Sequence, residues 1–201
     1  MDLVLFRGSD LQKAKIEKEK IISNLNLKAT HSVAFFVYFV VNINNPYPMQ
    51  FSHLHCHTQY SLLDGASKIP ALFAKAKADN MPAIAITDHG NMFGAFQFVA
   101  EAQKHEGVKP IVGCEFYVVE DRHKRQFTKE QKDKRFHQLL LAKNANGYKN
   151  LVKLCSLGYI EGLYGKYPRI TKAMIEQYKD DLIATTCCIG ASVPQMILKK
   201  R

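Results

Sequence analysis

Short apolar runs alternate with amphipathic segments throughout the chain after residue 49, and this alternation limits the possible folds more than any other feature. Strands are predicted over residues 83–87, 110–119, 136–142 and 182–187. Helices are predicted over residues 68–78, 92–105, 145–160 and 171–178, with a last one after Gly190. Strands that alternate with helices are typical of an α/β fold on a parallel sheet, either a barrel or an open sheet. Ligand sites in both lie at the carboxyl ends of strands.

Apolar spacing predicts which face each of the first two helices buries. In the helix over residues 68–78, which Ser67 is expected to cap, the inward residues are Ile69, Leu72, Phe73 and Ala76. In the helix over residues 92–105 they are Phe93, Phe96, Val99 and Ala100.

A histidine-rich stretch, FSHLHCHTQYSLLDG over residues 51–65, indicates a metal site. His53, His55 and His57 occupy alternate positions, and Asp64 follows seven residues after His57. In an extended chain, side chains two positions apart point to the same face. Imidazoles are common ligands of zinc, manganese and iron, and carboxylates complete such sites.

Acidic residues and another histidine lie in or after the next two apolar strands. Asp88 and His89 follow the strand over residues 83–87, although Asp88 could instead cap the next helix and His89 could be a turn residue. Glu115 lies inside an apolar strand, where an unpaired carboxylate would be costly. It therefore needs a cation, a metal ion or an exposed face.

His137 and Cys188 each have an ordinary alternative explanation. His137 lies between Phe136 and a leucine run, which suits a hydrogen-bonded core histidine. It also begins its strand, which is the wrong end for a site in a strictly parallel sheet, unless that strand has a reversed or irregular direction. Cys188 could simply be buried, as free cysteines commonly are.

Together these residues exceed the four ligands of a structural zinc site. A cluster of two or three metal ions fits them better, in which a bridging carboxylate holds ions about 3.5–4 Å apart. Such clusters hydrolyse phosphate esters. The sequence contains neither the G-x-S-x-G motif of serine hydrolases nor a P-loop.

Charge and cysteine usage add weaker constraints. A formal charge of +10 suits a polyanionic partner. The charge-dense segment over residues 120–135 is either a solvated loop or a basic arm that touches a nucleic-acid backbone. Five cysteines without a C-x-x-C pair do not resemble a disulfide framework, which favours a reducing, cytoplasmic compartment. No segment predicts a membrane partner, because the apolar run within residues 32–43 is too short to span a bilayer as a helix.

Residues 1–48 differ in pattern from the rest of the chain. Met49 opens directly onto the histidine-rich stretch. We therefore expect residues 1–48 to be an N-terminal extension or upstream readthrough, and residues 49–201 to be the functional domain.

Several segments resemble a known family. HCHTQYSLLDG at 55–65 and TDHGNMFGA at 87–95 resemble the first two motifs of the PHP (polymerase and histidinol phosphatase) domain. KPIVGCEFYV at 109–118, GASVPQMIL at 190–198 and the stretch over residues 137–170 resemble the N-terminal region of bacterial DNA polymerase III alpha subunits. The resemblance covers residues 49–201.

The resemblance implies a distorted (β/α)7 barrel with a trinuclear centre of zinc or manganese. The implied metal ligands are His55, His57, Asp64, His89, Glu115, His137 and Cys188. The first five of these would act in catalysis through bound metal and water. Asp88 would orient His89 or a water molecule without itself binding metal. His53 lies next to these residues in the sequence and is not an implied ligand. The implied activity is 3′–5′ exonuclease proofreading on DNA.

One departure from the family limits these expectations. Its last motif, an Asp-x-His, has no counterpart before Arg201. We therefore expect a truncated barrel, without the polymerase regions and the magnesium they would use. The intact protein would be a replicative polymerase whose partners are DNA, the polymerase core of the same chain, a sliding clamp and a proofreading subunit. The alternatives are a stand-alone phosphoesterase for a small phosphate monoester and a structural docking module that uses metal only for stability.

Overall fold

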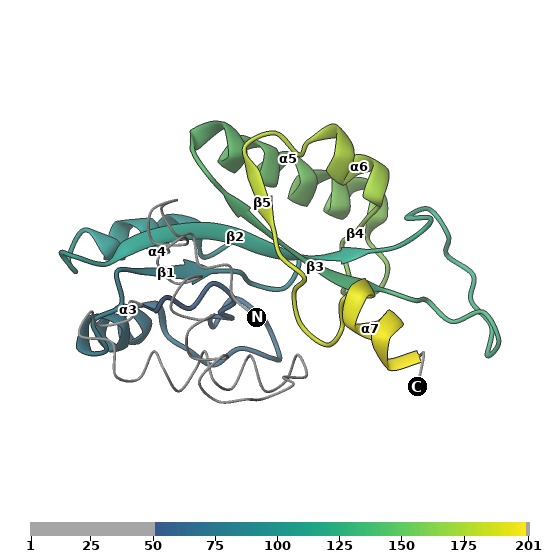
Figure 1. Ribbon diagram of the computed structural model, residues 1–201. Helices are drawn as coiled ribbons and strands as arrows, with labels where there is room; N and C mark the ends of the chain where they lie inside the picture. The colour runs from purple at the N-terminus through teal and green to yellow at the C-terminus, as the bar shows by residue number, and fades with distance from the viewer. Residues whose placement is uncertain (1–50, 200–201) are drawn as a thin grey trace, which may run out of the picture. The chain divides into compact units, whose positions relative to one another are not determined.

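The computed structural model describes residues 51–199, and the expectations for residues 1–48 lie outside this range. Five strands and five helices follow one another along these residues (Figure 1). Their bounds are α3 (Ile69–Ala78), β1 (Ala83–Ile86), α4 (Ala95–Ala102), β2 (Lys109–Val118), β3 (Phe136–Ala142), α5 (Ala145–Gly162), β4 (Arg169–Ile170), α6 (Lys172–Gln177), β5 (Leu182–Ala184) and α7 (Ser192–Lys199). The predicted α/β class is confirmed.

The five strands form one mixed sheet around the long central strand β2. The first half of β2 pairs with β1 in parallel, and its second half pairs with β4 in parallel on the same edge. On the other edge, β3 runs antiparallel to β2, and β5 runs antiparallel to β3. Over residues 51–199 the sheet is open, with the order β1-β2-β3-β5.

The expectation of a parallel sheet is therefore wrong for β3 and β5. A parallel connection needs a crossover, usually a helix, to carry the chain back to the start of the next strand. The segment between β2 and β3 contains no helix and extends as a long irregular loop (Figure 1). The chain therefore returns in the opposite direction, and His137 near the start of β3 lies opposite Tyr117 near the end of β2.

The two faces of the sheet have different roles. On one face, Phe116 of β2 and Leu140 of β3 pack with Leu151 and Leu154 of α5 in one core cluster. A second cluster packs α3 and α4 against β1. The opposite face carries Glu115, which pairs across the sheet with Leu139. Helices α3, α4 and α5 thus stabilise the sheet from one side. On the side of Glu115, Ala85, Leu139 and Leu141 form only a small apolar cluster, which leaves room for a site.

The ends of the helices partly match the sequence prediction. Thr171 caps α6 as expected, because its side-chain oxygen accepts a hydrogen bond from the N–H of Met174. Asn144 caps α5 by accepting from two backbone N–H groups. The prediction that Ser67 caps α3 is wrong, because Lys68 occupies the cap position without a side-chain bond.

The predicted inward face of α4 is also wrong. The helix begins at Ala95 rather than at residue 92, and a different set of residues faces the core. Ala95 and Phe98 are buried, whereas Phe96 is 87% exposed and Phe93, which precedes the helix, is 59% exposed. Apolar residues occur on both sides of this segment, so their spacing alone did not select the buried side. In the described part of the chain, no helix has the length and apolar character needed to cross a membrane.

We predict that Phe73→Ala lowers the free energy of unfolding by about 3–5 kcal/mol, because the ring is fully buried between α3 and α4. Urea denaturation measures this change. The matched control is Phe96→Ala, which removes an exposed ring and should change the value by less than about 0.5 kcal/mol. An equal decrease in the free energy of unfolding in the two variants would contradict the observation that Phe96 lies on the exposed side of α4.

Candidate metal centre

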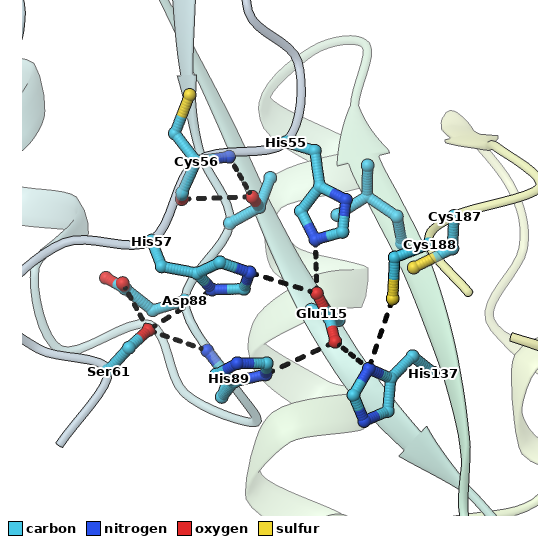
Figure 2. Close-up of polar contacts among 12 residues, drawn as sticks. His55, Cys56, His57, Ser61, Asp88, His89, Glu115, His137, Cys187 and Cys188 are labelled. Carbon is cyan, nitrogen blue, oxygen red and sulfur yellow. Dashed lines mark hydrogen bonds and ion pairs between the residues drawn. The ribbon is translucent and has the colours of Figure 1, made fainter. Parts of the chain in front are cut away.

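Glu115 lies at the centre of the candidate site. Its side chain is 1% exposed, and four histidine rings approach its two carboxylate oxygens (Figure 2). Oε2 contacts Nε2 of His55 and lies 3.2 Å from Nε2 of His57. Oε1 contacts Nδ1 of His137 and lies 3.2 Å from Nδ1 of His89. The partner that a carboxylate at this buried position needs is thus supplied by imidazoles.

The histidine-rich segment is extended but forms no regular strand. The backbone N–H of Ala85 donates to the carbonyl of His53 at 2.9 Å, and the N–H of Thr87 donates to the carbonyl of Cys56 at 2.9 Å. The N–H of Cys56 in turn donates to the Thr87 hydroxyl at 2.8 Å. These bonds hold the segment beside β1.

Two of the three histidines at alternate positions of this segment point into the site. His55 and His57 both reach Glu115. His53 is exposed, and its ring packs edge-on against Phe51 with the centroids 4.8 Å apart. Its place as a neighbour outside the cluster agrees with the expectation for this residue.

His89 is placed at the site because the chain after β1 continues to pair with β2 beyond Ile86. The N–H of Glu115 donates to the carbonyl of Asp88 at 3.1 Å, and the N–H of Gly90 donates to the carbonyl of Glu115 at 2.8 Å. Gly90 has a φ of +62°, and a Cβ there would lie 2.7 Å from Pro168. Glycine is needed at this turn, which places His89 directly beside Glu115.

Asp88 is buried and holds the loop after His57 without contacting Glu115. It accepts hydrogen bonds from the N–H of Thr58 at 2.5 Å, from the Thr58 hydroxyl at 2.7 Å and from the Ser61 hydroxyl at 2.7 Å. Its position agrees with a supporting role rather than with a role as a metal ligand.

Ser61 connects Asp88 to two of the histidines. Its single hydroxyl proton is donated to Asp88, so its oxygen acts as an acceptor toward other groups. That oxygen accepts from the backbone N–H of His89 at 3.1 Å and lies 3.4 Å from Nδ1 of His57. In a neutral His57 this arrangement favours the proton on Nδ1 and leaves Nε2, which faces Glu115, as a free lone pair.

The reversed direction of β3 places His137 and Cys188 at the same site. The N–H of His137 donates to the carbonyl of Gly190 at 3.1 Å. The Cys188 sulfur lies 3.4 Å from Nδ1 of His137. Both residues therefore lie at the expected site, for a reason that the sequence pattern did not supply.

Asp64 lies at the edge of the site. One of its carboxylate oxygens is 2.8 Å from Nε2 of His89, but its side chain is 59% exposed and does not contact Glu115. The exposed position differs from that of the other predicted ligands.

Three groups of side chains in this site have ligand atoms within 4.8 Å of one another, and all three share Glu115. They are His55–Glu115–Cys187, His57–His89–Glu115 and Glu115–His137–Cys188. Asp64 belongs to none of them. A carboxylate shared among ligand groups is the arrangement expected of a bridging residue in a multinuclear centre.

Cys187 is a candidate ligand that sequence reasoning missed. It has a φ of +58°, which departs from the extended backbone that would send successive side chains to opposite faces. Its N–H donates to the Thr185 hydroxyl at 3.1 Å. The left-handed turn lets Cys187 and Cys188 both approach Glu115 (Figure 2). The adjacent cysteines in the sequence were the available signal, but the turn between them could not be seen there.

The donor atoms fit a cation. Nδ1 of His89 and Oε1 of Glu115 are buried and lie 3.2 Å apart, but no hydrogen bond joins them. Burial favours a raised pKa for Glu115, but the interactions with His137, His55, His57 and His89 outweigh it and hold the pKa well below its usual range. The carboxylate is therefore charged, and imidazole, carboxylate and thiolate together suit a divalent transition metal.

A cavity of about 990 Å³ opens beside His89 and His137. The charged loop between β2 and β3 contributes residues 132–135 to its lining. The cationic lining residues are Lys132, Lys134, Arg135, Lys166 and Lys199, and the acidic ones are Asp64 and Asp133. This excess of positive charge suits an anionic ligand.

Known proteins resemble this chain in sequence. The PHP domain profile matches residues 53–201. The DNA polymerase III subunit alpha of Borreliella burgdorferi is 50% identical over 155 residues, covering 76% of this chain and 13% of that protein. The subunit of the same name from Thermus aquaticus is 47% identical over 156 residues, with the same two shares. The chain thus spans about one eighth of the length of these curated relatives.

A solved structure gives a weaker likeness. A protein from Bifidobacterium adolescentis, described as a candidate metal-dependent phosphoesterase, aligns with a TM-score of 0.39 and 22% identity. The alignment covers 54% of this chain and 33% of that protein. The family assignment therefore rests on the sequence matches.

We predict that the metal-free protein loses stability as the pH rises from about 6.5 to about 9. Contact with Glu115 raises the pKa of His137 from its ordinary value of 6.5 to about 9. Between these two pH values the folded protein retains a proton that the unfolded chain releases. The stabilisation by protonated His137 is therefore complete below pH 6.5 and is lost as the pH rises through 9. Denaturant unfolding at a series of pH values, in the presence of a chelator, measures it.

The variant Glu115→Gln removes the charge that raises this pKa and should flatten the dependence. His123→Ala, which changes an exposed histidine of the β2–β3 loop, should leave it unchanged. An unfolding free energy that is constant or increases across the window in the unaltered chain would contradict the prediction.

Proposed function

Because the chain belongs to the PHP domain family, we propose that it forms a divalent-metal phosphoesterase site that removes nucleotides from the 3′ end of DNA. The observation that carries the proposal is the buried Glu115 carboxylate shared by three groups of candidate ligands. A carboxylate so placed is suited to join metal ions rather than to stabilise the fold, because burying a charge is costly.

The proposed metal ligands are the side chains that converge on Glu115. They are His55, His57, His89, Glu115, His137, Cys187 and Cys188, with Asp64 at the edge beside His89. We propose two or three ions of zinc or manganese, since thiolate and imidazole donors suit zinc whereas a carboxylate also suits manganese. When bound, such ions would polarise a phosphate ester and activate water for its hydrolysis.

The chain's own residues position the donors and the substrate. Asp88 holds Ser61, whose oxygen accepts from the N–H of His89 and lies next to His57, so we propose that Asp88 orients both rings. Asp64 holds the outer nitrogen of His89. The cationic lining of the cavity would bind the phosphates of the strand next to this centre.

The sequence relatives suggest the wider context. They are named DNA polymerase III subunit alpha, and this chain matches their N-terminal region. We propose that the domain belongs to a bacterial replicase in the cytoplasm. Its proposed partners are DNA, a polymerase core that would use magnesium, a sliding clamp and a proofreading subunit. We also propose that the mixed sheet is part of a distorted (β/α)7 barrel.

We predict that the purified chain contains stoichiometric zinc or manganese by elemental analysis. The double variant His55→Ala/His57→Ala should lose it, because two of the three groups lose an imidazole. The matched control is His53→Ala, which removes a histidine of the same segment that faces solvent. Equal metal content in both variants and the unaltered chain would show that the metal is bound elsewhere.

We predict that the chain, supplied with that metal, shortens a labelled single-stranded oligonucleotide from its 3′ end. Glu115→Gln should reduce the rate at least about 100-fold, since even residues that only support ligands contribute about 10–100-fold. Glu106→Gln, an exposed acid, is the matched control.

Other outcomes would select the alternative functions. Hydrolysis of a small phosphate monoester without any cleavage of DNA would indicate a stand-alone phosphoesterase. A fold that survives chelation and hydrolyses neither substrate would indicate a structural module.

A further inference from the structure

Tyr117 packs beside two of the candidate metal ligands. It lies in β2 two residues after Glu115, so its side chain is on the same face of the sheet. Its ring lies nearly parallel to that of His89, with the centroids 5.9 Å apart and 16° between the planes. The ring of His137 meets it edge-on, with the centroids 5.4 Å apart. Tyr117 therefore packs against the two histidines that approach Oε1 of Glu115.

The ring of His137 lacks the hydrogen bond that normally orients a metal-binding histidine. Such a histidine usually donates from its second ring nitrogen to a carboxylate, a carbonyl or water. Nδ1 of His137 faces Glu115 and Cys188, and within residues 51–199 no carboxylate or carbonyl accepts a hydrogen bond from Nε2. Among these residues, the orientation of the ring therefore depends on the contacts of Nδ1 and on packing.

The ring of His89 is held by an exposed carboxylate and by stacking. Its Nε2 lies 2.8 Å from Asp64, whose side chain is 59% exposed. An ion pair at such an exposed position restrains a side chain weakly. The rings of His57 and Tyr117 lie at 18° and 16° to the plane of His89. Stacking is therefore the main restraint on the plane of this ring.

The position of Tyr117 is fixed on both edges of β2. It pairs with His137 of β3 on one edge and with Arg169 of β4 on the other. A Cβ at Gly90 would lie 3.1 Å from the Tyr117 ring, so glycine allows the turn after His89 to approach this ring closely. Within residues 51–199, the only tyrosine hydroxyl that forms a hydrogen bond is that of Tyr60. The contacts of Tyr117 are thus made by its ring.

Two further residues of the cavity lining support Tyr117. The ring of Tyr167 meets the Tyr117 ring edge-on, with the centroids 5.0 Å apart. The guanidinium of Arg135 lies 3.7 Å over the Tyr167 ring. Backbone hydrogen bonds of 3.0 and 3.1 Å between Tyr164 and Tyr167 hold the turn that carries this ring. Packed side chains therefore connect a cationic residue of the cavity to ligands of the candidate metal centre.

Core packing does not explain the place of Tyr117. Its ring belongs to none of the three apolar clusters found among the described residues. It is only partly buried, and it lines the cavity beside the site. The groups that it packs against are the two histidines and Tyr167. Its contacts thus restrain the site rather than the core.

We propose that Tyr117 is a positioning residue that holds the rings of His89 and His137 in the orientation that binds metal. Tyr167, with Arg135 stacked on it, holds Tyr117 in turn. This inference rests on the metal centre of the proposed function and adds a residue that acts through the ligands. Because the ring and not the hydroxyl makes the contacts, phenylalanine should replace tyrosine at this position.

The test is the affinity of the full 201-residue chain for Zn²⁺, measured by competition with a chromogenic chelator. Tyr117→Leu should bind zinc about 10-fold more weakly or worse, which is the effect of removing residues that support metal ligands. Tyr117→Phe should bind zinc as the unaltered chain does. Tyr167→Leu should weaken binding by a smaller factor. The matched control is Tyr148→Leu, which changes an exposed tyrosine of α5 and should leave the affinity unchanged.

A spectroscopic measurement separates positioning from a general loss of stability. Co²⁺ bound in place of zinc has a visible absorption spectrum that depends on the number and arrangement of its ligands. This spectrum should change in Tyr117→Leu and should be restored in Tyr117→Phe. Urea unfolding of each metal-free variant identifies any that does not fold. Where Tyr117→Leu does not fold, Tyr117→Met takes its place, because methionine keeps a long side chain without a ring.

The outcomes separate this inference from the proposed function. Equal zinc affinity and equal cobalt spectra in Tyr117→Leu and the unaltered chain overturn the inference, even where the chain cleaves DNA 3′ ends. An equal loss of affinity in Tyr117→Phe and Tyr117→Leu also overturns it, because the hydroxyl would then be the required group. The expected pattern of affinities without cleavage supports the positioning role and contradicts the phosphoesterase. Absence of zinc binding by the unaltered chain overturns the inference, and absence of cleavage as well contradicts both.

Discussion

The requirement to stabilise one buried carboxylate organises this structure. Glu115 lies in the central strand of the sheet, where water cannot solvate it, and four imidazoles meet its two oxygens. The histidines come from a segment before the first strand, from the end of that strand and from the reversed strand β3. Metal ions would supply positive charge next to Glu115, which His137, with its raised pKa, supplies in the metal-free protein, so this pKa shift and the metal chemistry have the same origin.

Support for the site is built into the fold through buried polar bonds. Asp88 accepts hydrogen bonds from the turn after His57. Ser61, which is bound to Asp88, in turn contacts His57 and the backbone of His89. Helices α3, α4 and α5 pack on the other face of the sheet, whereas α7 contributes Gln195 and Lys199 to the cavity beside the site. Stability and function are therefore carried by opposite faces of β2.

A second buried charge, Arg169, holds the cationic part of the cavity lining in place, as Glu115 holds the histidines of the site together. Its guanidinium binds carbonyls of α5 and of the loop between β2 and β3. A segment that has the composition of a solvated loop is thereby held against the cavity. The pairing of an anionic centre with a cationic rim suits a substrate whose phosphate is bound by both metal and lysine.

The sequence by itself determined the residue types of the site and the α/β class. Period-two spacing identified His55 and His57, and an acid inside an apolar strand identified Glu115, because burial demands a partner. Only the tertiary structure decided that β3 runs antiparallel, which brings His137 to the site, and that a left-handed turn adds Cys187. It also decided that α4 buries Phe98 rather than Phe96. Strand direction, turn conformation and helix phase depend on contacts between distant segments, and local spacing does not encode them.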